Sequence, residues 1–535
     1  MSGHVLQGPF DIPEMTNAVP RRLKPWVFIL FLVIIQLSGG LYLAAASDMV
    51  GTTALMQEDI LMAGYAQIVG MSVNFAVMFR LKFRFSGRTG LLLCGMVIMG
   101  CCAVCAVTDS VVLLVAACAV AGWFRMWATF ICNSTIQLWL TPVRDMSVFF
   151  CFVYLVVDGA IQLSGIAAVY TAFYSQWEYM HLLVIGLLAV MLVLVLLLLK
   201  PMRAPMFIPL LGIDWLGGFL WGLAALSFTF VCVYGNFYDW WDSAEITGAT
   251  VFGFVCIAVN LWRATFLHHP YISFQAMTNR NVVRASLIYV VFYTLLGTEH
   301  VFEHTYASTI LGFDETNLID LNFYVLVGIL AGVALTYWLF CRRRWRYKHM
   351  TALSVAFLSA YLAYFYFLID YGIEKEMLFM PLMLRGISSV ILSIVLLTSI
   401  VQSGLHFLVF PQALVINGFM GAVVSAAFGP AVIGEWFRHV MASNMSMIGS
   451  VVTDVNPVVD VGSLGDIAAM ISRQAMVVSM KEIYGWLLIA SLVFITVIAL
   501  SYAPLRPSAI FPKWRTIRKA IRGLARAESR EALKC

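Results

Sequence analysis

The chain has little charge. Asp, Glu, Lys and Arg make up 11% of its 535 residues, whereas 62% are hydrophobic, and the mean hydropathy is +0.90. This composition leaves too little polar surface for a soluble domain of any size. The sequence also lacks a GxxxxGK[ST] phosphate loop, so it gives no support to nucleotide hydrolysis.

Other hallmarks of soluble and secreted proteins are missing as well. Most of the eleven cysteines lie inside apolar segments, and the CxxC pair Cys102 and Cys105 has no second pair, so neither a zinc site nor a disulfide framework is indicated. No short apolar core with a cleavage site precedes the first long apolar segment, which predicts no removable signal. The net charge of +5 is spread over many loops and indicates no nucleic-acid site.

Long apolar segments are abundant instead. About 20 apolar residues in a helix cross the hydrocarbon core of a bilayer, because a helix satisfies its backbone hydrogen bonds internally. The sequence predicts fourteen such spans, at 26–47, 61–80, 90–107, 110–131, 147–171, 179–200, 213–235, 244–263, 282–305, 317–341, 350–370, 378–402, 408–434 and 484–505.

The charges between these spans alternate in sign from loop to loop. Basic residues are retained on the cytoplasmic side, and they occupy every second loop, from Arg21 and Arg22 through the run 342–348 to the tail 506–535. The opposite loops carry acidic residues, with Lys375 as a rare basic exception. Both termini are therefore predicted to be cytoplasmic.

Two segments outside the spans have a recognisable character. The stretch at about 435–483 is predicted to lie on the external side and to be partly helical. In the tail, apolar residues recur at helical spacing among lysines and arginines, which indicates a helix lying on the inner leaflet. A disordered basic tail is the alternative.

The sequence EHVFEH at 299–304 is the most unusual feature inside a predicted span. A charge at the bilayer centre costs about 2.5–3.5 kcal/mol, so an acid there is usually functional or paired. Residues four apart share a helix face, which places Glu299 beside Glu303, with His300 and His304 on the adjacent stripe. Two adjacent carboxylates resist ionising together, which suits them to exchange protons, with His300 as a relay.

Two other interpretations of this cluster remain open. It is either a self-satisfied structural cluster near the outer end of the span, or a set of carboxylate and imidazole ligands for zinc or another divalent ion.

Further buried residues are candidates for a central cavity. Asp158 in the fifth span is predicted to carry a proton, to meet a cationic substrate, or to hydrogen-bond a neighbouring helix. Arg125 is predicted to face the cavity rather than to snorkel. Trp127 and Phe302 are predicted to line an apolar part of it, with a lipid-facing position as the alternative for each.

Several short motifs follow one another in order between residues 212 and 484. They are GIDWLG at 212–217, DWWDS at 239–243, PYISF at 270–274, NRN at 279–281, LRGI at 384–387, SGL at 403–405, QAM at 474–476 and EIY at 482–484. In this order they resemble the fourteen-span drug:proton antiporter family, the multidrug resistance protein B type of the major facilitator superfamily. The resemblance implies structural roles for Asp214, which opens an additional helix, and for Arg385, which pairs with an acid in the second bundle.

The first half departs from the pattern of this family. The loop 80–88 (RLKFRFSGR) keeps the basic charge of the family loop G-x-L-x-D-R-x-G-R without its acid. Cys118 stands where the buried arginine of the family precedes Gly122 by four residues, and Arg125 lies one turn after Gly122. Segment 158–165 lacks the proline of the antiporter motif, and the acid common in the first span is missing. Glu299 and Glu303 are expected to replace that acid.

We therefore expect an all-α membrane protein with the major facilitator fold. A cytoplasmic tail (1–25) precedes a six-helix bundle (26–200). Two additional helices and a cytoplasmic link (201–281) lead to a second six-helix bundle (282–505), which includes the external segment 435–483. The basic tail (506–535) follows.

The resemblance implies a secondary transporter rather than an enzyme, with no cofactor. It implies export of small amphipathic or hydrophobic compounds in exchange for protons across a bacterial inner membrane, by alternating access. Such exporters often join a periplasmic adaptor and an outer-membrane channel, and 435–483 is available for that contact. Import or metal-complex transport is an alternative, and a haem-bearing redox subunit using His300 and His304 is an alternative of another class.

Overall fold

The computed structural model describes residues 15–16, 18–20, 22–39, 49–50, 55–141, 145–201, 210, 212–403, 405, 409–451 and 464–501. The predicted amphipathic tail at 506–535 and most of the N-terminal tail lie outside these residues. The regular structure of the described residues is helical, apart from an isolated bridge between Met15 and Leu199.

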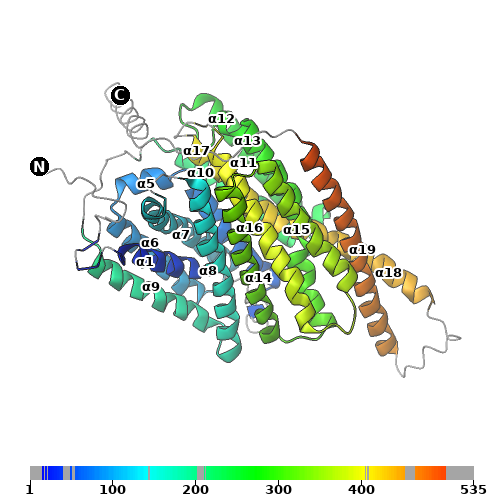
Figure 1. Cartoon of the computed structure of the whole chain (residues 1–535). Helices are drawn as coiled ribbons and strands as arrows, with labels where there is room; N and C mark the ends of the chain where they lie inside the picture. Colours follow the sequence, from blue (N-terminus) through cyan, green and yellow to red (C-terminus); the bar gives the residue numbers. More distant parts are fainter. Residues whose placement is uncertain are drawn as a thin grey trace, which may run out of the picture.

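The N-terminal half is a bundle of helices (Figure 1, blue to cyan). Its helices are α1 (Lys24–Leu37), α4 (Gln57–Asn74), α5 (Met78–Arg84), α6 (Gly87–Cys105), α7 (Val111–Leu140), α8 (Met146–Tyr174) and α9 (Glu178–Leu198).

A hairpin links the two halves. It consists of α10 (Trp215–Tyr234), the short turn η1 (Trp240–Asp242) and α11 (Ala244–Phe266), and α12 (Phe274–Met277) follows it. Asp214 caps α10, because its carboxylate accepts a hydrogen bond from the Gly217 N–H at 2.9 Å. The same carboxylate pairs with Arg263 of α11 at 2.8 Å. The structural role implied for Asp214 is therefore a cap and a tie between the two hairpin helices.

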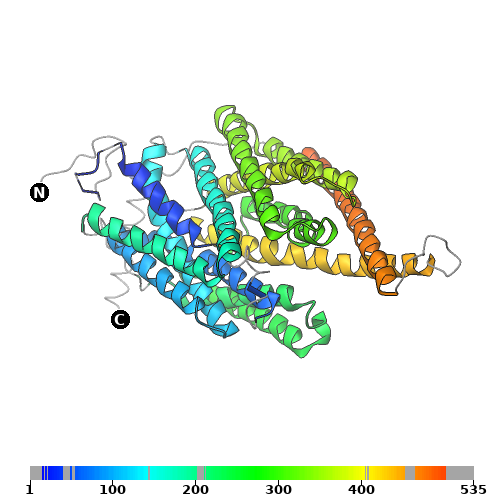
Figure 2. The ribbon, with the colours of Figure 1, turned by 90° about the horizontal axis from the view of Figure 1, so that it is seen from below.

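The C-terminal half forms the second bundle, beside the first in both views (Figures 1 and 2). Its elements are α13 (Arg280–Leu295), η2 (Glu299–Glu303), η3 (Tyr306–Ile310), α14 (Glu315–Thr336), η4 (Tyr337–Arg342), α15 (Tyr347–Leu368), η5 (Lys375–Leu378), α16 (Phe379–Val401), α17 (Phe410–Phe419), η6 (Met420–Phe428), α18 (Gly429–Val451) and α19 (Leu464–Leu500).

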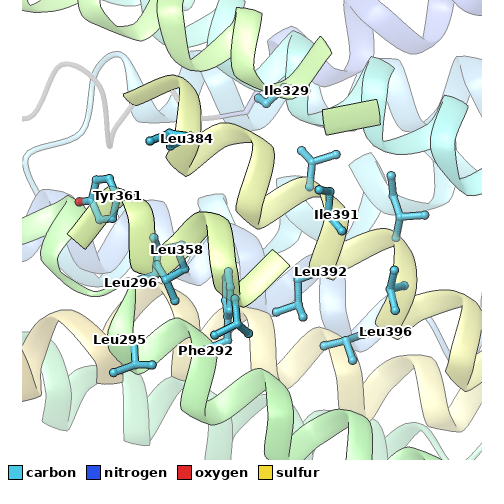
Figure 3. Packing of buried hydrophobic residues seen from close by; sticks show 14 of the residues in the cluster. Phe292, Leu295, Leu296, Ile329, Leu358, Tyr361, Leu384, Ile391, Leu392 and Leu396 are labelled. Carbon is cyan, nitrogen blue, oxygen red and sulfur yellow. The ribbon is translucent and has the colours of Figure 1, made fainter. Parts of the chain in front are cut away.

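Buried apolar side chains form two large clusters, each mainly within one half. Figure 3 shows part of the C-terminal cluster, where Phe292 of α13 and Leu358 of α15 approach Leu392 of α16. Lipid tails are as apolar as these side chains, so close packing rather than exclusion from water holds such helices together.

A crossing of small residues brings α4 and α7 into backbone contact. A methyl group on Gly122 would lie 2.0 Å from the Gln67 carbonyl oxygen, and one on Gly70 would lie 2.0 Å from that of Ala119. Only glycine permits this approach, so the role of Gly122 is to allow the crossing.

The number of helices that meet the length and hydropathy requirements of a span differs from the predicted fourteen. Twelve helices in the described residues do so, or thirteen if α4 and α5, bent by 66°, form one span. Each predicted span nevertheless contains a helix. The first is represented by α1, which has 14 described residues, and the second is the bent α4–α5 pair.

The last two spans are longer than the sequence predicted. The helical run Phe410–Val451 has 42 residues, and α19 has 37. At 1.5 Å per residue these extend about 60 Å and about 55 Å, roughly twice the hydrocarbon thickness. The described parts of the segment 435–483 therefore belong to α18 and α19, which project beyond the other helices (Figure 2).

The glycine crossing predicts a position-specific loss of stability. Gly122→Val should lower the thermal stability of the detergent-solubilised protein, because overpacking typically costs about 1–3 kcal/mol. Gly186→Val in α9 is the matched control, since a methyl group there meets nothing within 4 Å. Equal melting temperatures for the two variants would contradict the crossing.

Candidate functional site: a cavity between the two halves

A cavity of about 920 Å³ lies between the halves. The N-terminal half contributes Tyr65, Tyr154, Asp158 and Gln162; the hairpin contributes Val233, Asn236 and Trp240; the C-terminal half contributes Tyr289, Tyr293, Glu299, His300, Glu303, His304, Arg385, Ser389, Ser393, Asn417 and Glu435, among others. The four residues predicted to couple protons, Glu299, His300, Glu303 and Asp158, therefore all line one cavity.

An arginine holds the two glutamates together. Arg385 Nη1 lies 2.8 Å from Glu303 Oε2 and 3.3 Å from Glu299 Oε2. The second oxygen of Glu303 accepts a hydrogen bond from the Tyr361 hydroxyl at 2.8 Å, and the second oxygen of Glu299 lies 3.0 Å from His300 Nε2. Every carboxylate oxygen of the pair thus has a partner. The pairing role expected of Arg385 is present, and it involves two acids.

The charges of this cluster do not balance. Arg385 contributes one positive charge against the two negative charges of Glu299 and Glu303, so the group carries −1 when His300 is neutral and zero after one proton is added. The side chains of Arg385 and Glu303 are only 12% and 14% exposed. Because a net charge is costly where water is scarce, a proton neutralises the cluster at little structural cost.

Irregular backbone places this cluster at the cavity wall. The α-helix α13 ends at Leu295, and η2 continues it as a π-helix, a form that occurs often at functional sites. At Gly297 a methyl group would lie 2.6 Å from the backbone of Gly429. The close approach of these two glycines lets the glutamate-bearing segment lie against the start of α18.

Asp158 differs from the glutamates because no ion pair or hydrogen bond engages its carboxylate in the described part of the chain. It lies on α8 of the N-terminal half. Tyr154 of the same helix and Tyr293 of α13 are its electrostatic neighbours. The carboxylate is therefore free to meet a ligand, and the predicted hydrogen bond to a neighbouring helix is not formed.

Three residues predicted for the cavity lie elsewhere. Trp127 is 2% exposed and Phe302 is 1% exposed. Trp127 packs among aromatic rings in the N-terminal core, and Phe302 packs between Phe437 and Tyr484. These two expectations were wrong because helical spacing does not tell a cavity-facing ring from one packed between helices.

Arg125 also does not line this cavity. It is 3% exposed and donates to the backbone oxygen of Gln36 at 3.0 Å and to its side-chain oxygen at 2.8 Å. Gln36 in turn donates to Thr129 at 2.7 Å. Arg125 therefore ties α7 to the last turn of α1, where carbonyl groups favour a cation.

Several cavity residues were not predicted from the sequence. Trp240 was missed, as was Glu435, which was assigned to the external segment 435–483. Tyr361, a buried core residue that holds Glu303 without lining the cavity, was missed as well. Tyrosines are frequent in the chain, which has 21 of them, and only the packing shows which ones gather at the cavity. The signal that was available for Glu435 is its position five residues after Pro430, at the end of an apolar run.

The cavity opens toward the acidic loops. Gln57 and Asn236, both exposed, line it at that end. At the basic end the halves are in contact: Arg344 forms an ion pair with Asp145, which caps α8, and Cys151 Sγ lies 3.6 Å from Cys341 Sγ. These contacts close the end that carries the arginine run.

Two alternative interpretations of the histidines find no support in the geometry. Arg385 occupies the position between the two glutamates where a cation would bind, and no group of three or more His, Cys, Asp or Glu side chains in the described chain is arranged to hold a metal ion. His181, the other candidate haem ligand, is buried against Trp177 in the N-terminal core, away from His300.

The balance of charge in the cluster predicts a pH-dependent defect. Arg385→Gln removes the cation and leaves two adjacent carboxylates, and breaking a buried pair typically costs about 3–5 kcal/mol. Because protonation relieves the repulsion, the variant should be more stable at pH 5.5 than at pH 8. Adding Glu303→Gln should restore most of the stability at pH 8. Equal losses at both pH values, with no rescue, would contradict the paired geometry.

Comparison with known proteins identifies the fold. No protein-family model and no curated protein matches the sequence. A peptide transporter of the POT type in complex with alafosfalin matches with a TM-score of 0.56 at 12% identity, over 91% of this chain and 97% of that one. A structure from work on substrate recognition in proton dependent oligopeptide transporters gives 0.55 at 12%, over 89% and 99%. The nucleoside transporter NupG gives 0.53 at 11%, over 88% and 99%. The chain thus has the fold of these solved structures, which is the major facilitator fold.

Proposed function

We propose that the protein is a proton-coupled secondary transporter that exports small amphipathic compounds, in particular those that carry a positive charge. The observation that carries this proposal is the cluster of Arg385 with Glu299 and Glu303. This cluster has a net charge of −1 and borders the cavity between the halves. The fold supports the proposal. In transporters of this architecture the two halves rock around a central cavity, so that the cavity opens alternately to the two sides of the membrane.

The predicted topology makes the present conformation outward-facing. The open end of the cavity carries the acidic loops and the closed end carries the arginine run, which the positive-inside rule assigns to the cytoplasm. In this conformation a proton enters from outside and neutralises the cluster. Rocking the halves then breaks the Arg344–Asp145 contact and exposes the cluster to the cytoplasm, where the proton leaves.

In this mechanism Asp158 binds the positive charge of the substrate. Its carboxylate is unpaired, while the carboxylates of Glu299 and Glu303 are already engaged by Arg385. A cation in the cavity therefore meets Asp158 at a lower cost than it would meet the glutamates. The rings of Tyr154 and Tyr293 border the same space and add cation–π attraction. A substrate carboxylate, as in a peptide, is disfavoured because Arg385 is already saturated.

The finer features of the sequence-based expectation belong to this proposal. We infer fourteen spans, with the bent α4–α5 pair as the second and α1 as part of the first. We also infer a bacterial inner membrane with both termini in the cytoplasm. An adaptor of a tripartite exporter would meet the projecting ends of α18 and α19.

Transport driven by an imposed pH difference tests the proton step. In vesicles that are acidic on the face bearing the acidic loops, the wild-type protein should move tetraphenylphosphonium toward that face. Glu299→Gln and Glu303→Gln should each lower the pH-driven rate at least tenfold, because the cluster no longer binds and releases a proton. Glu376→Gln, an exposed acid outside the cavity, is the control. Full pH-driven activity in both cluster variants would refute the proton-coupling role.

The closed end provides a test of alternating access. A disulfide needs about 2.05 Å between sulfurs, so the thiols of Cys151 and Cys341, 3.6 Å apart, are close enough to join upon oxidation with copper phenanthroline. The cross-link should stop transport, and dithiothreitol should restore it. Cys151→Ser retains another close pair of thiols, Cys105 and Cys118 at 4.0 Å, and its transport should be insensitive to the oxidant. Undiminished transport by the cross-linked protein would rule out rocking at this interface.

A further inference from the structure

The hairpin between the halves forms part of the cavity wall. Helix α10 packs against α4 of the N-terminal half and against η6 of the C-terminal half. Cys232, Val233, Asn236 and Trp240 all line the cavity. The hairpin is therefore more than a covalent connection between two bundles, because its outer end borders the mouth through which any solute must pass.

The backbone conformation of the turn at the outer end of the hairpin fixes the orientation of the Trp240 side chain. Asp239 and Trp240 have φ values of 52° and 56°, a left-handed conformation that costs about 1–3 kcal/mol for each such residue and persists only where surrounding contacts impose it. The Trp240 N–H donates to the Gly235 carbonyl at 2.7 Å. A methyl group on Gly235 would lie 2.7 Å from the indole ring, so glycine makes room for the ring to fold against α10.

Contacts on both sides fix the turn across the mouth. The Trp240 indole N–H donates to Glu435 Oε2 of α18 at 2.9 Å. Glu435 is held in turn by Arg438 at 2.7 Å, and Asp239 lies 3.8 Å from Arg438. On the other side, the hydroxyl of Tyr234, at the end of α10, donates to Asp59 of α4, which is 6% exposed.

From this arrangement we propose that Trp240 is a substrate-contacting residue that determines selectivity at the cavity mouth, and that Glu435 is the residue that positions it. The ring face of an indole attracts cations and stacks on flat aromatic groups. Trp240 therefore favours cations with aromatic substituents over small aliphatic ones. This inference rests on the proposed function, because it presupposes that cations traverse the cavity.

Transport kinetics with two cations test this assignment. For Trp240→Ala, the KM for tetraphenylphosphonium should rise about two- to tenfold, the factor that corresponds to one lost aromatic–aromatic contact of about 0.5–1.5 kcal/mol. The KM for tetraethylammonium, which has no ring to stack on the indole, should rise by a smaller factor. Trp240→Phe should keep most of the wild-type preference. Glu435→Ala should reproduce the selectivity change, and Glu435→Gln, which retains an oxygen acceptor for the indole, should not.

Trp262→Ala is the matched control. It lies on the same hairpin, is 66% exposed and does not line the cavity, so its kinetics should equal those of the wild type. Equal KM changes for both cations in Trp240→Ala would overturn the assignment, while transport that still depends on Glu303 would leave the proposed function standing. A wild-type protein that moves neither cation would refute both.

Discussion

One guanidinium between two carboxylates is the interaction on which the rest of the cavity depends. Arg385 on α16 engages Glu299 and Glu303 together, and this single cation makes two acids tolerable at membrane depth. It also leaves one uncompensated negative charge. A fully balanced ion pair would only hold the bundle together, whereas this group changes its net charge with the gain or loss of one proton.

The surrounding structure places this charge imbalance at the wall of the cavity. The π-helical segment η2 and the contact between Gly297 and Gly429 place the acids on the cavity wall. Asp158, on the opposite half, faces the same space with no partner of its own among the described residues. In the proposed mechanism, one half bears the proton-binding cluster and the other bears an unpaired carboxylate, so that rocking of the halves would change the exposure of both together. The hairpin α10–α11 touches both halves at the mouth.

The sequence was most informative where chemistry and periodicity coincide. Each predicted span contains a helix. Glu299, Glu303, His300 and Asp158 all line one cavity, and they could be singled out from the sequence because ionisable residues are rare at membrane depth. The positions of Trp127 and Phe302 were not predictable, because the sequence pattern of an aromatic residue on a helix is the same whether its ring faces a cavity or a neighbouring helix. The lengths of α18 and α19 were misjudged because their projecting turns carry mixed polar and apolar residues, as a loop does. The ion pair at the closed end could not be predicted either, because Asp145 and Arg344 are 199 residues apart in the sequence.

Proton release upon cation binding is the decisive measurement for the coupling between the cluster and the substrate. Purified protein in weakly buffered detergent solution near neutral pH is titrated with tetraphenylphosphonium while a pH indicator reports released protons. We expect the wild type to release up to one proton per bound cation, because the positive charge of a cation near Asp158 disfavours the proton bound to the cluster. We expect no release for Glu303→Gln, although that variant still binds the cation. Cation binding by the wild type without proton release, or equal release by Glu303→Gln, would show that the cluster does not couple protons to the cation.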